Sequence, residues 1–246
     1  AVATDLNPTG SDSIINLKAD VGSVAVSSDL QTDALNVTAG TNFEMSGDVA
    51  AGDGPVVFSA AGVILIDGNM ESGQFSADAG DQLELTADIN TDENPVNLVG
   101  GGDVNTCGDI QAGELSIESG ANLKLVADNH VINGPISLVA TNGDMIVSGS
   151  IAGGEFTMAA GGDLKLNTDI NATGPITLEA DGDMIVSGSI AGEEFAITAG
   201  GDLKLNTDID TTEPVTLEVD GGIHVNGNIT AEKLTVKTSE HLELST

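Results

Sequence analysis

Short apolar–polar–apolar segments recur along the chain with a period of two. In one stretch the segments 176–178 and 184–186 are followed by a turn and the single apolar residue Ile190, and the same order returns 19 residues later. A period of two broken by glycine-rich turns predicts β-strands, because an amphipathic helix needs apolar positions at a period of 3.6. We therefore expect a chain built from short strands.

The strand pattern repeats along almost the whole sequence. Residues 143–153 recur unchanged at 182–192, and the prolines after Pro8 are spaced by 40, 40, 40 and 39 residues, at Pro55, Pro95, Pro135, Pro175 and Pro214. Each long repeat holds two similar halves, so the structural unit is about 20 residues long. Reading one apolar position per unit gives twelve units, at Val24, Phe43, Val63, Leu83, Val104, Leu123, Met145, Leu164, Met184, Leu203, Ile223 and Leu242.

Units of this size cannot bury an apolar face alone, but stacked units share a continuous core. The sequence therefore predicts an all-β fold, a single right-handed parallel β-helix (β-solenoid) of about twelve coils of about 20 residues. Residues 1–13 are expected to form an N-terminal extension that could serve in assembly, and residues 14–246 the solenoid domain. An antiparallel β-sandwich is the alternative, because regularly spaced short strands suit that fold as well.

The charge balance of the chain is strongly acidic. It carries 39 acidic side chains against 6 basic ones, all of them lysine, for a formal net charge of −33. This balance excludes a nucleic-acid binder that relies on phosphate contacts. The most apolar run, residues 56–66, is too short for the roughly 20 residues of a membrane-spanning helix, so we expect no transmembrane segment. Cys107 is the single cysteine, which excludes an internal disulfide framework.

Stacking in register places equivalent residues in columns along the rod, so function is sought in columns. The five phenylalanines fall in inward columns and are expected to be core. One outward column, here called the Ser/Thr column, offers a hydroxyl face that could bind glycan or ice, although Ser and Thr are also usual on a solvated strand. Its members are Asn36, Val57, Ser76, Asn97, Ser116, Ser137, Thr157, Thr177, Ala196, Thr216 and Thr235.

A second outward column interleaves isoleucine with lysine. Apolar side chains on an outer face mark interaction sites, and half of the lysines fall in this column. The alternative is an ordinary β-branched strand position with solubilising charge. The lateral interface predicted from this column consists of Ile64, Lys124, Ile146, Lys165, Ile185 and Lys204.

A third column, here called the Asp column, precedes the single apolar residue of each unit. Short polar side chains in such turns can accept hydrogen bonds from backbone N–H groups. Stacked carboxylates also repel one another at a coil spacing of about 4.8 Å, and a divalent cation would relieve that repulsion. Hard oxygen ligands suit calcium. Ca²⁺ is therefore the expected cofactor, with candidate ligands Asp88, Asp109, Asp128, Asp169 and Asp208, and with further carboxylates in the Gly-Asp turns at Asp144, Asp163, Asp183 and Asp202.

Catalysis is not expected, and no residue is assigned a catalytic role. Parallel β-helices include enzymes that cleave polysaccharides, but this chain has no arginine to hold an acidic sugar and no tryptophan or tyrosine to stack on one. His130, His224 and His241 fall in different columns, and no nucleophile or base recurs beside them.

The repeated motifs resemble those of a known family. Ala-Gly-Gly-Asp-Leu-x-Leu begins at Ala160 and Ala199, and Gly-Asp-Met-Ile-Val-Ser-Gly-Ser-Ile begins at Gly143 and Gly182. These runs resemble the repeats of filamentous haemagglutinin-like exoproteins, which are large secreted bacterial adhesins. The resemblance spans nearly the whole chain. It implies a right-handed β-helical shaft that is exported to the cell surface or beyond.

The ends of the repeat suggest how such a shaft could assemble. The repeat starts near Ile14 and persists to Leu244, with no evident cap to shield the terminal strand edges. We expect a homo-oligomer or filament through open terminal coils, or a piece of a longer shaft. The function predicted from the sequence is a non-catalytic extracellular structural protein, a filament subunit or adhesin shaft. The alternative is a surface module that binds glycan or ice.

Overall fold

The computed structural model describes residues 2–3, 13–126, 128–131 and 134–245 of the chain. Every regular element in those residues is a β-strand, and every pairing between strands is parallel. The strands form one sheet of 12 strands and one of 22 strands. The prediction of an all-β parallel solenoid is therefore confirmed, and the antiparallel sandwich is excluded.

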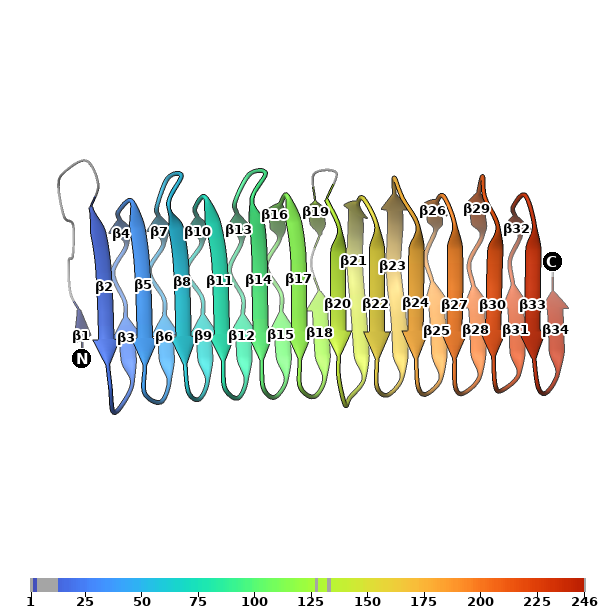
Figure 1. Ribbon diagram of the computed structural model, residues 1–246, viewed down its shortest axis with the longest axis horizontal. Coiled ribbons are helices and arrows are strands. Elements are labelled where there is room, and N and C mark those ends of the chain that lie inside the picture. The colour runs from blue at the N-terminus through green and yellow to red at the C-terminus, as the bar shows by residue number, and fades with distance from the viewer. Residues whose placement is uncertain (1, 4–12, 127, 132–133, 246) are drawn as a thin grey trace.

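The 12-stranded sheet, here called the front row, contributes one strand to each coil and faces the viewer in Figure 1. Its strands are joined by eleven successive parallel pairings, so the chain makes about eleven turns. They are β2 (Ile14–Ala19), β5 (Ala34–Ala39), β8 (Pro55–Ala60), β11 (Gln74–Ala79), β14 (Pro95–Gly100), β17 (Glu114–Ser119), β20 (Ile136–Ala140), β22 (Phe156–Ala160), β24 (Ile176–Ala180), β27 (Phe195–Ala199), β30 (Val215–Val219) and β33 (Leu234–Thr238).

The 22-stranded sheet lies behind and contains two further strands per coil, a second row and a third row. The second row comprises β3 (Val24–Val26), β6 (Phe43–Met45), β9 (Ile64–Ile66), β12 (Leu83–Leu85), β15 (Val104–Thr106), β18 (Leu123–Val126), β25 (Met184–Ser187), β28 (Leu203–Asn206), β31 (Ile223–Asn226) and β34 (Leu242–Ser245). The third row comprises β4 (Leu30–Gln31), β7 (Val49–Ala50), β10 (Met70–Glu71), β13 (Ile89–Asn90), β16 (Ile110–Ala112), β19 (Asn129–Val131), β26 (Ile190–Gly192), β29 (Ile209–Thr211) and β32 (Ile229–Thr230). The long strands β21 (Met145–Gly153) and β23 (Leu164–Ala172) run through both rows.

The hand of the coil is visible in Figure 1. The chain descends along the front row, ascends along the strands behind it and advances from the N-terminal end on the left to the C-terminal end on the right. These three directions together define a right-handed helix, as the sequence predicts. Right-handed crossover between parallel strands follows from the twist of the strands themselves.

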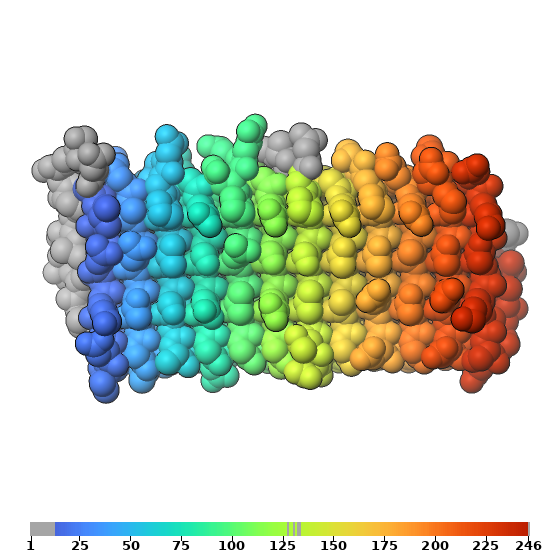
Figure 2. Space-filling model, viewed as in Figure 1, coloured from blue at the N-terminus to red at the C-terminus, as the bar shows by residue number. Residues whose placement is uncertain are grey.

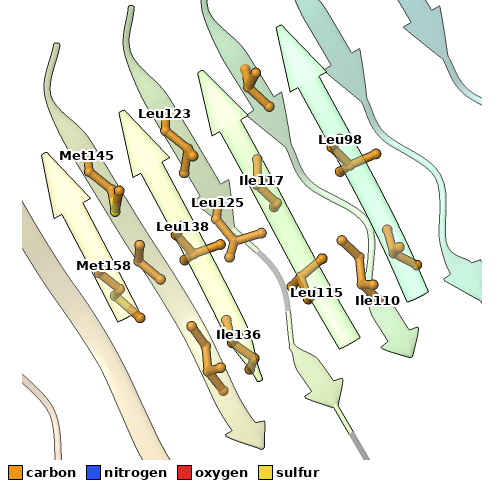
Figure 3. Close-up of a cluster of buried hydrophobic side chains, with 14 of the residues drawn as sticks. Leu98, Ile110, Leu115, Ile117, Leu123, Leu125, Ile136, Leu138, Met145 and Met158 are labelled. Carbon is orange, nitrogen blue, oxygen red and sulfur yellow. The ribbon is translucent and has the colours of Figure 1, made fainter. Parts of the chain in front are cut away.

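The space inside the coil is filled by the inward residues of all three rows. Figure 3 shows a central part of this core, where Leu115 and Ile117 of β17 lie near Leu123 and Leu125 of β18. The five phenylalanines are all fully buried, which confirms their predicted place. Side chains that stack on their own equivalents in every coil give a core that is continuous from one coil to the next.

One stretch of the predicted register is wrong. The sequence pattern predicts Val63 inward and Ile64 on the outer face, but Ile64 pairs with Phe43 and Leu83 and has 0% of its surface exposed. The apolar run 63–66 has no polar residue to show which face is buried. The turn decides the register, because Ala60 stacks on Ala39 and the strand that follows begins four residues later in both coils. Leu65 therefore takes the outward place.

The two ends of the rod differ in how their inward side chains are covered. At the first coil, β1 (Val2–Ala3) adds a further parallel strand to β3. Residue 1 and residues 4–12 of the predicted N-terminal extension lie outside the described residues. At the last coil, Leu244 stacks on the buried Val225 yet is 57% exposed, because no strand of the described residues lies on its other side.

A buried hydroxyl in the core leads to a first prediction. Thr106 lies in an inward column between Leu85 and Leu125, is fully buried, and its Oγ1 has no hydrogen-bond partner in the part of the chain that the structure describes. A buried hydroxyl without a partner costs free energy that a methyl group of the same shape does not. We expect Thr106→Val to raise the free energy of unfolding by about 1 kcal/mol, measured by chemical denaturation.

The matched control for this substitution is Thr91→Val. Thr91 is equally buried, but its Oγ1 donates to the carbonyl oxygen of Asn94 at 2.7 Å. The same loss of a hydroxyl therefore removes a hydrogen bond there and should destabilise the protein by about 1 kcal/mol. Two shifts of the same sign would contradict the explanation.

Candidate functional site

The front row presents the predicted Ser/Thr column as a continuous line of side chains. The strand register places the column members side by side from Asn36 to Thr235, as the sequence predicts. Figure 2 shows this face of the rod as regular rows of side chains. Val57 and Ala196 interrupt the column. A neighbouring outward column on the same strands contains the carboxylates of Asp78, Glu118, Glu179 and Glu218, so the face is not uniformly hydroxylic.

The Asp column has a defined structural role that connects successive coils. In most steps the Oδ1 of one member accepts a hydrogen bond from the backbone N–H of the equivalent residue in the next coil, at 2.7 to 3.0 Å. The acceptors are Asp29, Asp48, Asn69, Asp88, Asp109, Asp128, Asp169 and Asp208. Each side chain thus satisfies a turn N–H that the strands leave unpaired. The sequence predicted local turn capping, whereas these bonds cross between coils.

The Gly-Asp turns contain a second ladder of the same kind. From Asp103 onward each acceptor oxygen binds the N–H of the equivalent residue one coil later, at 2.8 to 3.0 Å. The acceptors are Asp103, Asn122, Asp144, Asp163, Asp183 and Asp202. The aspartates of both ladders are therefore explained as inter-coil acceptors.

The candidate calcium ligands do not converge on one point. Asp88, Asp109 and Asp128 stand in successive coils, while Asp169 and Asp208 lie farther along the same column. Within the described residues, no three His, Cys, Asp or Glu side chains gather closely enough to hold one metal ion. One oxygen of each candidate is also engaged by a backbone N–H. The geometry does not build the closed oxygen cage that calcium sites usually have.

The first six coils form a groove beside the Asp column. The sequence pattern does not predict this groove. Its volume is about 790 Å³, and it follows β4, β7, β10, β13 and β16 along the third row. Its outer lining includes Gln31, Glu71, Asn90 and Gln111 together with the Asp column. The third row carries only two or three residues per strand, so its outward side chains gave no periodic pattern in the sequence.

The role of the Asp column as an acceptor ladder predicts how two substitutions at Asp88 should differ. Its Oδ1 accepts the N–H of Asp109 at 2.9 Å, and Asn69 performs the same task for Asp88 one coil earlier. Asp88→Asn keeps an acceptor and should leave the melting temperature unchanged. Asp88→Ala removes it and should lower the melting temperature by about 2–4 °C, measured by circular dichroism. Equal effects of the two would contradict the ladder.

Hydrogen bonds from two serines lower the pKa values of the carboxyl groups that they contact. Ser150 donates its hydroxyl at 2.8 Å and its N–H at 2.9 Å to Oδ1 of Asp128, and these bonds hold the pKa of Asp128 below its usual 3.8. Ser189 donates its N–H at 2.7 Å and its hydroxyl at 2.9 Å to Asp169, with the same effect on that pKa. Both sets of bonds favour the ionised carboxylate.

The lowered pKa determines the direction in which the stability of the protein changes with pH. Because the folded pKa lies below the unfolded one, the stabilisation is complete above about pH 4 and is lost as pH falls through the folded pKa. We expect Ser150→Ala to raise the pKa of Asp128 toward 3.8 in an NMR titration. The difference in the free energy of unfolding between Ser150→Ala and the protein without the substitution should decrease as the pH falls. Ser148→Ala, in the same strand, should leave the titration of Asp128 unchanged.

The residues predicted to form a lateral interface lie in one outward column, except for Ile64. The pairings of the second row place Lys124, Ile146, Lys165, Ile185 and Lys204 in adjacent coils, and Ile146 and Ile185 are 39% and 37% exposed. Ile64 is core, as described above, and Leu65 occupies its place on the outer face. The outward column, here called the Glu/Lys column, reads Ala25, Glu44, Leu65, Glu84, Asn105, Lys124, Ile146, Lys165, Ile185, Lys204, His224 and Glu243.

The histidines remain separate in the fold. His224 Nδ1 lies 3.2 Å from Glu243 Oε2 of the next coil, within the Glu/Lys column. His130 belongs to β19 in the third row, and His241 directly precedes β34. The register thus places the three residues in different columns, as the sequence indicates.

Comparison with known proteins gives one match. The family model described as hemagglutinin repeat matches residues 77–215, which is more than half of the chain. No curated protein and no solved structure matches the chain. The residues that the structure describes include no helix long and apolar enough to cross a membrane.

Proposed function

The chain belongs to the hemagglutinin repeat family, and we propose that it is the non-catalytic shaft of a secreted or surface-bound adhesin or filament. Repeats of this family are typically found in secreted or cell-surface adhesins without enzymatic activity. The observation that carries the proposal is the unbroken parallel stacking of the front row from β2 to β33. Such stacking makes a stiff spacer whose length is set by the number of coils.

A spacer should tolerate a change in length that a specific site would not. Deleting residues 154–192 joins Gly153 to Glu193 and restores the repeat sequence, because residues 143–153 are identical to residues 182–192. The shortened protein should remain folded and lose two coils, which is about 10 Å of length by small-angle X-ray scattering. Unfolding of the shortened protein would contradict a modular shaft.

The alternative function, recognition of glycan or ice, depends on the Ser/Thr column. Its supporting observation is the run of half-buried hydroxyls from Ser116 to Thr177. If the protein is a shaft without this second function, it should give no signal on a glycan array and should not inhibit ice recrystallisation. A signal that is lost in Thr157→Lys would favour the alternative, and Glu179→Lys on the neighbouring column is the matched control.

We propose further that rods join end to end. The support is the constant parallel register of the described coils, each paired with the next, so that a coil of a second copy could continue the stack. A strand edge with apolar side chains pairs readily with another coil. Negative-stain microscopy should show fibres several rods long, and Leu242→Lys with Leu244→Lys should abolish them. Glu240→Lys, which is close by but outside the strand, should not. Single rods at all concentrations would contradict end-to-end assembly.

We propose that Ca²⁺ stabilises the rod by offsetting the negative charge of the Asp column, and not by binding in a chelating site. In the part of the chain that the structure describes, each stacked carboxylate keeps one oxygen that no backbone N–H engages, and the columns concentrate negative charge at the coil spacing. Millimolar Ca²⁺ should therefore raise the melting temperature above its value in chelator. The same concentration of Mg²⁺ should act less, since Mg²⁺ keeps its water shell. No rise with Ca²⁺ would remove the proposal.

A further inference from the structure

The corrected Glu/Lys column has an internal symmetry. About Asn105 in β15, the residues on one side are Glu84, Leu65 and Glu44, and those on the other side are Lys124, Ile146 and Lys165. The two halves have the same alternation of charged and aliphatic side chains, but the charges are opposite. The correction of Ile64 to Leu65 leaves this pattern unchanged, because both side chains are aliphatic.

Within the described residues, the four charges nearest Asn105 in this column have no ion-pair partner. Ion pairs between lysine and carboxylate in the described residues are Lys18–Asp20 and Lys237–Glu218, neither of which belongs to the column. Glu44, Glu84, Lys124 and Lys165 are exposed. Between Glu44 and Lys165 the charged members alternate with uncharged ones, so neighbouring charges there are two coils apart, about 10 Å, and too distant to pair along the rod.

We propose that this face binds a second copy of the chain in an antiparallel, two-fold arrangement centred on the coil of Asn105. Reversing the rod places Lys124 opposite Glu84 of the second copy and Lys165 opposite Glu44 of the second copy. Ile146 then meets Leu65 of the second copy. The symmetry repeats each contact, so one interface holds four ion pairs and two aliphatic contacts. The spacing matches because both surfaces have the same coil pitch.

Two other alignments of the rods are less favourable. Parallel rods in register would place glutamate on glutamate and lysine on lysine, and like charges in direct contact are repulsive. An antiparallel pair centred one coil later would place Lys124 opposite its own copy. The alignment centred on Asn105 avoids both conflicts, and it sets two amide side chains, which can bond to each other, on the symmetry axis.

The single cysteine lies on the same axis. Cys107 follows β15 in the coil of Asn105, two residues farther along the chain, and it is exposed. A two-fold axis parallel to the strands of this coil brings each outer-face residue of this coil opposite its own copy. The two Cys107 thiols of a dimer would therefore face each other, which offers a direct chemical reporter of the predicted register.

Long-range charge opposes the pairing and gives it a characteristic salt dependence. Each copy carries a formal charge of −33, and Asp103, in the coil of the axis, would face its own copy at the rim of the interface. Salt at 0.15 M screens charges beyond about 8 Å but weakens direct contacts less. Association is therefore expected to be stronger at 0.15 M than at 0.01 M salt.

Sedimentation equilibrium of the full chain with reducing agent tests the proposal. At about 100 µM protein and 0.15 M salt, dimers should be present, and Lys124→Glu with Lys165→Glu should raise the dissociation constant at least about tenfold. Lys233→Glu with Lys237→Glu changes the net charge equally, from −33 to −37, outside the column and should have little effect. A monomer at this concentration, or equal effects of the two double variants, would overturn the proposal.

A charge exchange separates specific pairing from misfolding. Glu44→Lys with Glu84→Lys makes the column wholly basic between Glu44 and Lys165, and Lys124→Glu with Lys165→Glu makes it wholly acidic. Each variant alone should be monomeric, whereas a mixture of the two should form a heterodimer. Failure of the mixture to associate, with both variants folded by circular dichroism, would overturn the proposal.

Oxidation of Cys107 tests the register. With dioxygen and a copper–phenanthroline catalyst, two Cys107 thiols form one S–S bond, and their two protons and two electrons pass to the oxidant. The unmodified chain should give a covalent dimer on a non-reducing gel, and Lys124→Glu with Lys165→Glu should slow its formation at least about tenfold. Equal rates in the two proteins would mean random collision and would overturn the alignment.

Discussion

Replacing Phe58 with alanine is expected to lower the free energy of unfolding by about 3–5 kcal/mol. Phe58 of β8 is fully buried, and its ring lies 4.6 Å from the ring of Phe43 in β6 and 5.6 Å from that of Phe75 in β11, measured between centroids. The substitution loses apolar burial, leaves a cavity and removes two aromatic contacts. Because the three rings come from three consecutive coils, the loss affects the coupling between coils as well as one strand.

Guanidinium unfolding followed by far-ultraviolet circular dichroism measures this effect, since the chain has no tryptophan or tyrosine for fluorescence. Phe58→Leu keeps most of the apolar volume and should cost less than about 1.5 kcal/mol. Stability in a solenoid is a sum over coils and their interfaces, so Phe58→Ala should also separate the unfolding of the N-terminal coils from that of the rest. A loss below about 1 kcal/mol for Phe58→Ala would contradict the place of the ring in the core.

The fold was predictable because each coil repeats the same physical solution. The period of two identifies the strands, the near-identical tandem segments require stacking, and the buried phenylalanines follow from the inward columns. The failure at residues 63–66 has the same origin. A strand register is read from polar residues, and four consecutive apolar residues contain none, so only the turn after Ala60 fixes which side chains point inward.

The candidate site was predictable only in part, because its chemistry lies between coils. The sequence shows that Asp88 and Asp109 are equivalent, but not that the carboxylate of the first accepts the N–H of the second. Repulsion between stacked carboxylates thus suggested a metal, whereas the structure reveals an acceptor ladder that explains the residue type. The inverted charges about Asn105 do not depend on that register error, because the glutamates and lysines share one column whether Ile64 or Leu65 faces outward.

The second large loss of stability is expected from a substitution at Gly188, in the turn between β25 and β26. Its φ of +106° is a backbone conformation that residues with a Cβ rarely adopt, and a Cβ there would lie 2.1 Å from the carbonyl oxygen of Thr168 in the preceding coil. Because that oxygen belongs to the backbone of β23, it cannot move without shifting a whole coil. We expect Gly188→Ala to lower the free energy of unfolding by about 3 kcal/mol or more, combining backbone strain and overpacking.

Gly52 offers the control that separates these two causes. Its φ is +55°, but a Cβ there would meet nothing within 4 Å, because the residue lies in the turn after β7. Gly52→Ala therefore introduces the left-handed strain alone and should cost about 1–2 kcal/mol in the same denaturation experiment. If Gly188→Ala costs no more than Gly52→Ala, the close approach of neighbouring coils does not limit the residue type. If it costs more, the difference measures how tightly the coil spacing constrains the turns.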